Sequence, residues 1–292
     1  MTPSLIAVTG STGLLGGRLA LRLAAEGARQ RLIVRDPSRA PSLPGTEIAV
    51  AGGYSDAVGM RAALDGADTL FLVSGREAAD RVEQHVAAID AAVDAGVTRI
   101  VYTSFLGASP TSTFTLGRQH WATEQHLRGT GVRFTLLRDS FYHAMFGHLV
   151  GADGVIRGPA GTGRVASVAH DDVADVATAV LLDERADVHD GRAYDVTGPE
   201  PISMADAAAH LTRATGREIR YEPETVDQAY ASRAHYGAPA YEVEGWVTSY
   251  TAIGAGDLEV VSPTVPRLTA RDAQSFPQWL EANPQALEHL RA

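Results

Sequence analysis

The segment that bears most directly on chemistry is a glycine-rich run near the N-terminus, after the apolar residues 5–8. It reads Thr9-Gly10-Ser11-Thr12-Gly13-Leu14-Leu15-Gly16. Its spacing, G-x-x-G-x-x-G, differs by one residue from the usual dinucleotide fingerprint, and it permits a tight turn with close backbone approach to a pyrophosphate. A helix that begins here offers free N–H groups and the positive end of its dipole to phosphate. The run predicts a nucleotide site; the plainer interpretation is an ordinary strand-to-helix turn.

The second candidate binding residue is Arg35, which follows the apolar residues 31–34. A site that prefers NAD has an acidic side chain at this point, which accepts a hydrogen bond from the ribose 2′-hydroxyl. A guanidinium is suited instead to a phosphate, which it binds through two parallel hydrogen bonds. We therefore expect NADP(H). The alternative is a solvated loop arginine whose charge is neutralised by Asp36.

Residue types that are absent limit the chemistry further. All 25 residues counted as Lys+Arg are arginine, and the chain of 292 residues has no cysteine. A lysine Schiff base, a P-loop lysine and a Tyr-x-x-x-Lys pair are therefore excluded, as is any disulfide. His143 and His148 are five apart and do not share a helix face well, and no Cys or His-Glu-x-x-His pattern occurs, so we predict no metal.

Charge and hydropathy point away from large polyanionic or lipid partners. The net charge is −10, which argues against nucleic acid. No apolar run approaches the roughly 20 residues of a membrane-spanning helix. Residues 1–4 carry no charged segment of the kind that opens a signal peptide. We expect a cytoplasmic protein that binds a small-molecule substrate and binds neither nucleic acid nor membranes. A homodimer is the oligomer that the sequence leaves open.

The elements that must position these residues alternate between strand and helix. Strands are predicted at residues 5–8, 31–34, 47–50, 69–73, 99–102 and 134–137. Helices are predicted at residues 14–26, 57–64, 81–95 and 118–128, the second capped by Ser55 or Asp56. Near-continuous apolar strands at this spacing indicate an α/β fold with a doubly wound parallel sheet, buried on both faces.

The pattern loosens after about residue 150. Residues 151–163 are rich in glycine and are expected to form a loop or hairpin. A helix at 173–182 with Asp171 as its cap, a strand at 194–196, a helix at 204–215 and a strand at 218–221 follow. We expect a dinucleotide-binding domain at 1–150, to which 165–198 returns. Residues 199–292, rich in aromatics, are expected to form a smaller α/β substrate lobe over the carboxyl ends of the strands.

Taken together, the motifs resemble the NmrA-like branch of the atypical short-chain dehydrogenase/reductases. The resemblance is strongest to the NAD(P)H-dependent quinone reductase and triphenylmethane reductase subgroup. It covers most of the chain, best to about residue 200 and more loosely through 254–271. It rests on Thr9 to Gly16, Val34-Arg35-Asp36-Pro37, Tyr102-Thr103-Ser104, Glu124, residues 131–138, Asp172-Val173-Ala174 and Thr197-Gly198-Pro199. The fold that the resemblance implies is a Rossmann-type sheet.

The resemblance also implies further cofactor contacts, each at the end of a strand. Ser74 and Gly75 are expected along the adenosine and its ribose. Thr103, Ser104 and Phe105 follow the fifth strand. Asp139, Ser140 and Phe141 follow the sixth strand and are expected to flank the nicotinamide. For each of these residues the alternative is a polar turn at a strand end.

Candidate catalytic residues are fewer. Where related isoflavone-reductase-like enzymes carry lysine, this sequence has His120. Glu124 lies four residues on, on the same helix face, so it could orient or charge the imidazole; the alternative is a surface His–Glu pair. Tyr142 could supply a hydroxyl, as could Tyr102, and Ser104 is a further candidate. Members of the family often have Glu-Asn after the aromatic of the sixth-strand loop, and this chain has Tyr142-His143 instead.

These features predict an NADPH-dependent oxidoreductase that reduces a quinone or a similar conjugated molecule by hydride transfer. A quinone becomes an aromatic hydroquinone on reduction, so a site without a strong general acid favours such acceptors over ketones. The alternative is a non-catalytic NADP(H)-binding redox sensor of the NmrA type. A nucleotide-sugar epimerase or dehydratase is a third hypothesis, which the missing Tyr-Lys pair disfavours.

Overall fold

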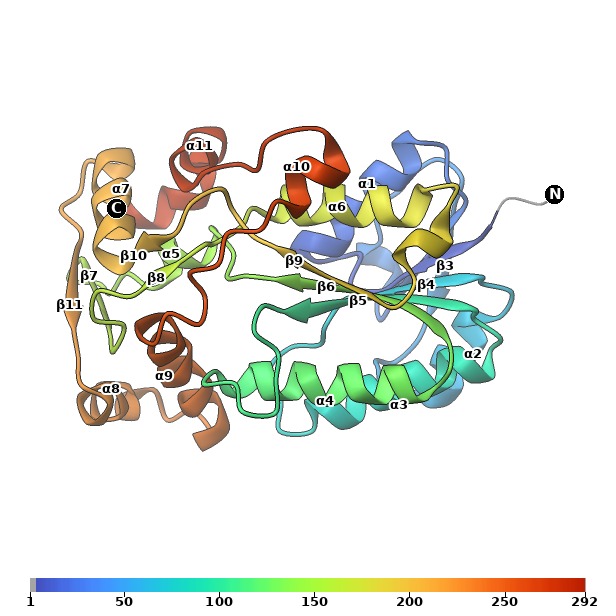
Figure 1. The fold of residues 1–292 in the computed structure, drawn as a ribbon, viewed down its shortest axis with the longest axis horizontal. Coiled ribbons are helices and arrows are strands. Elements are labelled where there is room, and N and C mark those ends of the chain that lie inside the picture. Colours follow the sequence, from blue (N-terminus) through green and yellow to red (C-terminus); the bar gives the residue numbers. More distant parts are fainter. Residues whose placement is uncertain (1–3, 292) are drawn as a thin grey trace. The chain divides into compact units, whose positions relative to one another are not determined.

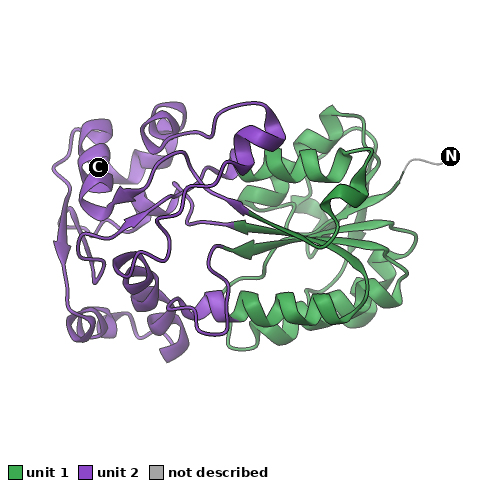
Figure 2. Cartoon of the chain, viewed as in Figure 1, with its two compact units in different colours: residues 1–105, 119–138, 173–194 green, residues 106–118, 139–172, 195–292 purple. Residues whose placement is uncertain are grey.

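The structure, a computed structural model, describes residues 4–291 and divides into two compact units, which Figure 2 colours separately. Unit 1 comprises Met1–Phe105, Gln119–Arg138 and Val173–Tyr194, and unit 2 comprises Leu106–Arg118, Asp139–Asp172 and Asp195–Ala292. The expected assignment of the cofactor to residues 1–150 and 165–198, and of the substrate to residues 199–292, stays a prediction.

A seven-stranded sheet forms the centre of unit 1, in the order β3-β2-β1-β4-β5-β6-β9. Its registers are parallel, for example Ile6 opposite Gln30 on one side and opposite Thr69 on the other. Each strand predicted for the first half of the chain is confirmed, as is the parallel α/β fold. The strands are β1 (Ile6–Val8), β2 (Gln30–Val34), β3 (Thr46–Val50), β4 (Thr69–Leu72), β5 (Arg99–Phe105), β6 (Arg133–Asp139) and β9 (Arg192–Val196).

Helices cover both faces of this sheet (Figure 1). On one face lie α1 (Leu14–Ala25) and α6 (His170–Leu182), which are joined by an ion pair between Arg22 and Asp175. On the other lie α2 (Ala57–Leu64), α3 (Arg81–Asp94) and α4 (Thr115–Gly129). Short 3₁₀ turns occur at η1 (Pro37–Arg39) and η2 (Ala186–His189). The unit is therefore doubly wound.

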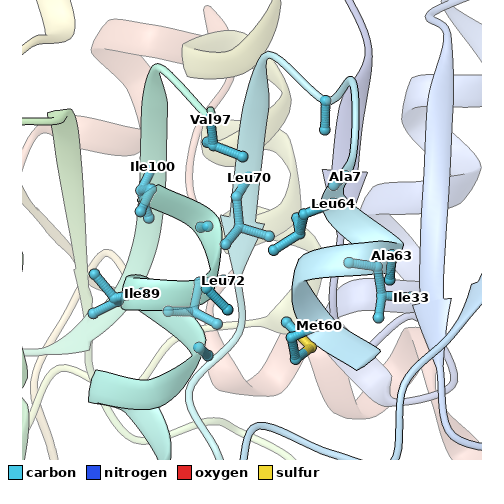
Figure 3. Packing of buried hydrophobic residues seen from close by; sticks show 14 of the residues in the cluster. Ala7, Ile33, Met60, Ala63, Leu64, Leu70, Leu72, Ile89, Val97 and Ile100 are labelled. Atoms are coloured by element: carbon cyan, nitrogen blue, oxygen red, sulfur yellow. The ribbon is translucent and has the colours of Figure 1, made fainter. Parts of the chain in front are cut away.

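The core between the sheet and α2–α4 explains why the strands read as continuous apolar runs. Leu70 and Leu72 point into this core between Met60 and Ile89 of the helices (Figure 3). Side chains alternate between the faces of a strand, so the intervening Phe71 is buried on the opposite face. Because both faces are covered, every position of β4 must be apolar or hydrogen-bonded within the protein.

Local sequence signals set the ends of the helices. Asp56 caps α2 by accepting a hydrogen bond from the Gly59 N–H at 2.9 Å, as expected. Helix α1 ends where Gly27 adopts a positive φ of 70°, a conformation that glycine adopts without steric cost. The cap predicted for α6 is wrong: the helix begins at His170, so Asp171 lies in its first turn rather than before it.

Unit 2 contains short strands and several helices. The two-stranded pairs are β7 (Val155–Gly158) with β11 (Arg220–Pro223), parallel, and β8 (Arg164–Val165) with β10 (Ile202–Ser203), antiparallel. Its helices are α5 (Met145–His148), α7 (Met204–Thr215), α8 (Val226–Arg233), α9 (Ala240–Gly254), α10 (Thr264–Thr269) and α11 (Phe276–Ala282), with 3₁₀ turns η3 (Ala234–Tyr236) and η4 (Pro284–Leu290).

The expectation of a loop or hairpin at 151–163 is only partly right. A local antiparallel bridge joins Val150 and Ile156, as in a hairpin. The strands within and after the segment, however, pair with residues about 65 and 38 positions farther along the chain. Local composition carries no information on such distant partners. Among residues 4–291, none of the helices combines the length and the apolar character needed to cross a bilayer.

Candidate functional site

The glycine run forms a tight turn between β1 and α1. The Gly13 N–H donates to the Gly10 carbonyl at 2.9 Å, and Gly10 has a positive φ of 65°. A Cβ on Gly16 would lie 2.4 Å from the Gly10 carbonyl oxygen, so only glycine allows the helix to pack this close to the turn. At Gly13 a Cβ would lie 3.2 Å from the same oxygen. The first and third glycines therefore shape the turn.

The N-terminus of α1 has the properties of an anion site. Among the described residues, no side chain caps this helix and no acidic residue lies in its first turn. The Ser11 hydroxyl beside it is buried and has no hydrogen-bond partner within residues 4–291. First-turn N–H groups have no partners within the helix, so a phosphate would satisfy both them and the hydroxyl. These residues fit the pyrophosphate of a dinucleotide.

A cavity of about 300 Å³ opens beside this turn, entirely within unit 1. Thr12 and Arg35 line it, together with Ser74 and Gly75 from the segment after β4. The four residues were each expected at a nucleotide site, and the structure brings them to one cavity. Two further lining residues, Tyr54 and Arg76, carry no motif that would have singled them out.

Arg35 is exposed at this cavity and is available to a ligand. Within the described residues its guanidinium makes no hydrogen bond or ion pair. It makes no ion pair with the neighbouring Asp36 in the described residues. One carboxylate oxygen of Asp36 accepts instead from both the N–H and the hydroxyl of Ser38, at 3.0 and 2.7 Å. These bonds hold the pKa of Asp36 below its ordinary value. The alternative of an Arg35–Asp36 pair is therefore not observed.

His120 lies in a buried hydrogen-bond network rather than on the helix surface. Its Nε2 accepts from Nη2 of Arg81 at 3.0 Å, because a guanidinium can only donate. The ring hydrogen must then be on Nδ1, which faces the Tyr102 hydroxyl at 2.9 Å. Burial and the charge of Arg81 lower the pKa of His120 well below 6.5. The imidazole is therefore neutral, and both of its nitrogens are engaged.

The expected partnership of Glu124 with His120 is wrong. The Glu124 carboxylate is fully buried and accepts two hydrogen bonds from Arg138, at 2.8 and 2.6 Å. It also accepts from the Ser104 hydroxyl at 2.6 Å. A buried carboxylate is stable only with such partners, so the arginine of the adjacent strand pairs with it instead of the histidine. This also engages Ser104, a candidate catalytic residue.

Thr103 and Phe105 were expected after the fifth strand, but they belong to β5 itself and have structural contacts. Thr103 accepts from the Ser74 N–H through its hydroxyl, at 2.7 Å, and so supports the cavity wall. Phe105 is buried, with its ring stacked on that of His120 at 6.1 Å between centroids. Both residues lie in unit 1, next to the network described above.

Four expected site residues belong to unit 2 and lie together there. Asp139 accepts a hydrogen bond from the Tyr142 hydroxyl, and burial, followed by this carboxylate, raises the pKa of Tyr142 well above 10. The Ser140 hydroxyl is buried without a partner in the described part of the chain. Phe141 packs edge-on against Phe114, with ring centroids 5.4 Å apart. Ser140 therefore has an unused donor and acceptor.

The departure from the family pattern at 142–143 also has a structural role. The His143 side chain contacts the Ser167 hydroxyl at 2.9 Å and the Gln274 carbonyl at 3.0 Å. Burial lowers its pKa to about 4, so the ring is neutral. His143 thus ties the segment after β6 to the segment before α11 within unit 2.

Sequence reasoning missed Arg81 and His85, two buried residues of α3. His85 is fully buried, and burial followed by the charge of Arg81 lowers its pKa to about 3. Arg81 is only 4% exposed. The one available signal was a basic residue at the first position of a helix, where charge opposes the helix dipole. Such a position needs a specific partner to be favourable.

Comparison with known proteins agrees with this geometry. Residues 2–264 match the NmrA-like family. An NAD(P)H azoreductase from Xenophilus azovorans is 30% identical over 286 residues, covering 97% of this chain and 99% of that protein. A (4-alkanoyl-5-oxo-2,5-dihydrofuran-3-yl)methyl phosphate reductase from Streptomyces griseus is 35% identical over 288 residues, covering 97% and 99%.

Among solved structures, that of an NADPH-dependent quinone oxidoreductase from Escherichia coli, complexed with NADPH, is similar with a TM-score of 0.84. The two chains are 30% identical in sequence, and the match covers 95% of this chain and 99% of that one. The match of most of the chain to one family, and of nearly its whole length to these relatives, shows that the protein belongs to the NmrA-like family.

Proposed function

We propose that this protein is an NADPH-dependent oxidoreductase that reduces small conjugated acceptors such as quinones. The bound cofactor would supply a hydride from its nicotinamide ring. Two features of unit 1 support this cofactor: the uncapped N-terminus of α1 beside the unpartnered Ser11 hydroxyl, and the exposed Arg35 at the same cavity. The first fits a pyrophosphate, and the second fits the 2′-phosphate that distinguishes NADPH from NADH.

The remaining cofactor contacts are proposed strand by strand. Gly10, Ser11, Thr12, Gly13, Leu14 and Leu15 would hold the pyrophosphate through backbone N–H groups and hydroxyls. Ser74 and Gly75 would line the adenosine side. Thr103, Ser104 and Phe105 would support the cofactor from β5, and Asp139, Ser140 and Phe141 would flank the nicotinamide. Of these last three, Ser140 has a buried hydroxyl free to bond a ligand.

The observation that carries the choice of acceptor is that the candidate catalytic residues Ser104, Tyr142 and His120 are already engaged. The Ser104 hydroxyl donates to Glu124, and the Tyr142 hydroxyl donates to Asp139. His120 is neutral, and its N–H faces Tyr102. A ketone needs an acid as its alkoxide forms, whereas the anion of a reduced quinone is delocalised and takes its proton from water. The contacts therefore favour conjugated acceptors.

The relatives' names agree with this class. An azo group, a quinone and an oxo-dihydrofuran bearing an acyl group are each electron-poor conjugated systems. The compounds in these names share a π system that accepts hydride and delocalises the resulting charge. We extend that shared property, and not any one named substrate, to this chain.

The test is a turnover assay with purified protein, NADPH and a panel of acceptors, followed by loss of reduced-nicotinamide absorbance. The panel contains benzoquinones, naphthoquinones, an azo dye and, as the unconjugated control, a simple aliphatic ketone. We expect turnover with at least one conjugated acceptor and none with the ketone. Reduction of the ketone at a comparable rate would contradict the proposal.

A variant tests whether turnover depends on the proposed phosphate cradle. Gly13→Val places a side chain 3.2 Å or less from the Gly10 carbonyl, at the mouth of the proposed phosphate cradle. It should abolish both NADPH binding and turnover. Gly129→Val is the matched control, because a Cβ there meets no atom within 4 Å. If the wild type binds NADPH but reduces no acceptor in the panel, the redox-sensor alternative replaces the enzyme.

A further inference from the structure

The turn that follows β4, residues 73–75, is held by side chains at nearly every backbone polar group. The Val73 N–H donates to the Thr9 hydroxyl at 3.0 Å, and the Val73 carbonyl accepts from the Tyr54 hydroxyl at 2.5 Å. The Ser74 N–H donates to the Thr103 hydroxyl at 2.7 Å. Three residues from separate parts of unit 1 therefore fix the first two peptide groups of this turn.

Side chains of helix α3 fix the third peptide group of this turn, that of Gly75. The Gly75 N–H donates to Nε2 of His85 at 2.7 Å, and the Gly75 carbonyl accepts from Nε of Arg81 at 2.8 Å. A backbone N–H can only donate, so His85 must be neutral with its hydrogen on Nδ1, which faces the Thr123 hydroxyl at 2.9 Å. Arg81 also donates to His120 through Nη2. One guanidinium thus joins the turn to the histidine network of α4.

The turn is a wall of the cavity, and so are Thr9 and Tyr54, but the two α3 residues that hold Gly75 do not line it. Val73, Ser74, Gly75 and Arg76 line the cavity, whereas Arg81 and His85 lie behind them and are 4% and 0% exposed. Arg81 does not line the cavity, so apart from its charge it influences a ligand through the shape of the turn. A turn that is already ordered loses less conformational entropy when a ligand binds, and this raises affinity.

We propose that Arg81 is a positioning residue for the cofactor, which holds the Gly75 turn in its binding shape while His120 holds the guanidinium. This inference rests on the proposed function and adds a role for two residues that would not touch the cofactor. It also gives His120 a role other than proton donation. This role requires both histidines to be neutral. A protonated imidazole carries a hydrogen on each nitrogen, so it could not accept a hydrogen bond from Arg81 or from the Gly75 N–H.

The first experiment measures the turn itself in cofactor-free protein. Backbone amide hydrogen exchange at Ser74 and Gly75 should be at least about tenfold faster in Arg81→Met than in the wild type, because the turn then opens more often. Arg61→Met, which removes an exposed guanidinium from α2, is the matched control and should leave these rates unchanged. Equal exchange in Arg81→Met and the wild type would overturn the proposal.

The second experiment measures the consequence for the cofactor. Calorimetry without acceptor should show that Arg81→Met weakens NADPH binding about 10- to 100-fold, typical of losing hydrogen bonds from a charged group. In turnover, the KM for NADPH should rise by a similar factor while kcat at saturating NADPH stays near that of the wild type. A purely structural role would lower the unfolding midpoint without this split between KM and kcat.

A conservative variant keeps the test decisive if Arg81→Met does not fold. Arg81→Lys retains the charge, but its single ammonium cannot reach both the Gly75 carbonyl and His120 as the guanidinium fork does, so it should restore only part of the affinity. NADPH affinity equal to the wild type in a folded Arg81→Lys protein, with Gly75 exchange also unchanged, would contradict the proposal. If the wild type itself fails to bind NADPH, the proposed function falls, whereas the exchange experiment still reports on the turn.

Discussion

Burial decides what each of two arginines in unit 1 can do. Arg81 is 4% exposed and directs its donors at a backbone carbonyl and a histidine ring, so its geometry is set by the protein. Arg35 is exposed at the cavity and, in the described part of the chain, has no fixed partner. A guanidinium that is hydrogen-bonded within the protein can support the shape of a site, whereas one without a fixed partner can bind a ligand.

At this scale the prediction concerns cofactor choice. Arg35→Ala should weaken NADPH binding by about 1–3 kcal/mol, the usual contribution of hydrogen bonds to charged groups, because the 2′-phosphate loses its partner. NADH binding should stay nearly the same, since NADH carries a hydroxyl there. Calorimetry with both cofactors measures the difference. Arg39→Ala, a second exposed arginine of the same segment, is the control, and equal losses for the two cofactors would remove Arg35 from the site.

Among the elements, α4 is connected to two strands of the sheet through one buried carboxylate. Glu124 on the helix accepts from Arg138 of β6 and from Ser104 of β5. These contacts place the face of α4 that carries His120 against the strand that carries Tyr102. The ion pair thus sets the position of the network that supports the Gly75 turn.

Removing this carboxylate should destabilise unit 1. Glu124→Ala removes the buried carboxylate that accepts from Arg138, and because the Arg138 side chain is 20% exposed the cost should not exceed about 3–5 kcal/mol, that of breaking a fully buried pair. Urea unfolding measures the change in the free energy of unfolding. Glu83→Ala, at an exposed position of α3, should change it by no more than about 0.5 kcal/mol. A Glu124→Ala protein as stable as the Glu83→Ala control would mean that the ion pair contributes little to the position of α4.

Across the whole molecule, each unit buries neutral histidines. His85 and His120 lie in unit 1, and His143 lies in unit 2. Burial lowers the pKa of His85 to about 3 and that of His143 to about 4, from an ordinary value of 6.5. Protons therefore bind the unfolded chain before they bind the folded protein, so acid favours unfolding.

The expected pH dependence of stability follows from the lowered pKa values of these histidines. Stability should be full above about pH 7 and fall as the pH drops from 6.5 towards 4, by up to about 1.4 kcal/mol per pH unit for each such histidine. Urea midpoints at pH 8, 6 and 5 measure this. His143→Gln should make the decline shallower, whereas His235→Gln, at an exposed position, should not. An unchanged slope in His143→Gln would show that His143 does not contribute.

The local features of this protein follow from its sequence alone. Strands and helices of unit 1 form where apolar periodicity predicts them, because a parallel sheet covered on both faces needs continuous apolar strands. The glycine turn, the uncapped helix and the position of Arg35 depend on residues within a short stretch of chain. The sequence therefore predicted that these residues lie together, and the nucleotide site that they would form stays a proposal.

Tertiary structure alone decided which polar groups become partners. His120 bonds to Arg81, 39 residues away, rather than to Glu124 four residues away, and Glu124 bonds to Arg138 on a neighbouring strand. Strands β7 and β11 pair across a still longer interval, as Val155 lies opposite Arg220. Helical spacing shows which side chains share a face, but the strand packed against that face determines which of them are buried and paired. Burial makes an unpaired charge costly, so the tertiary neighbour prevails over the sequence neighbour.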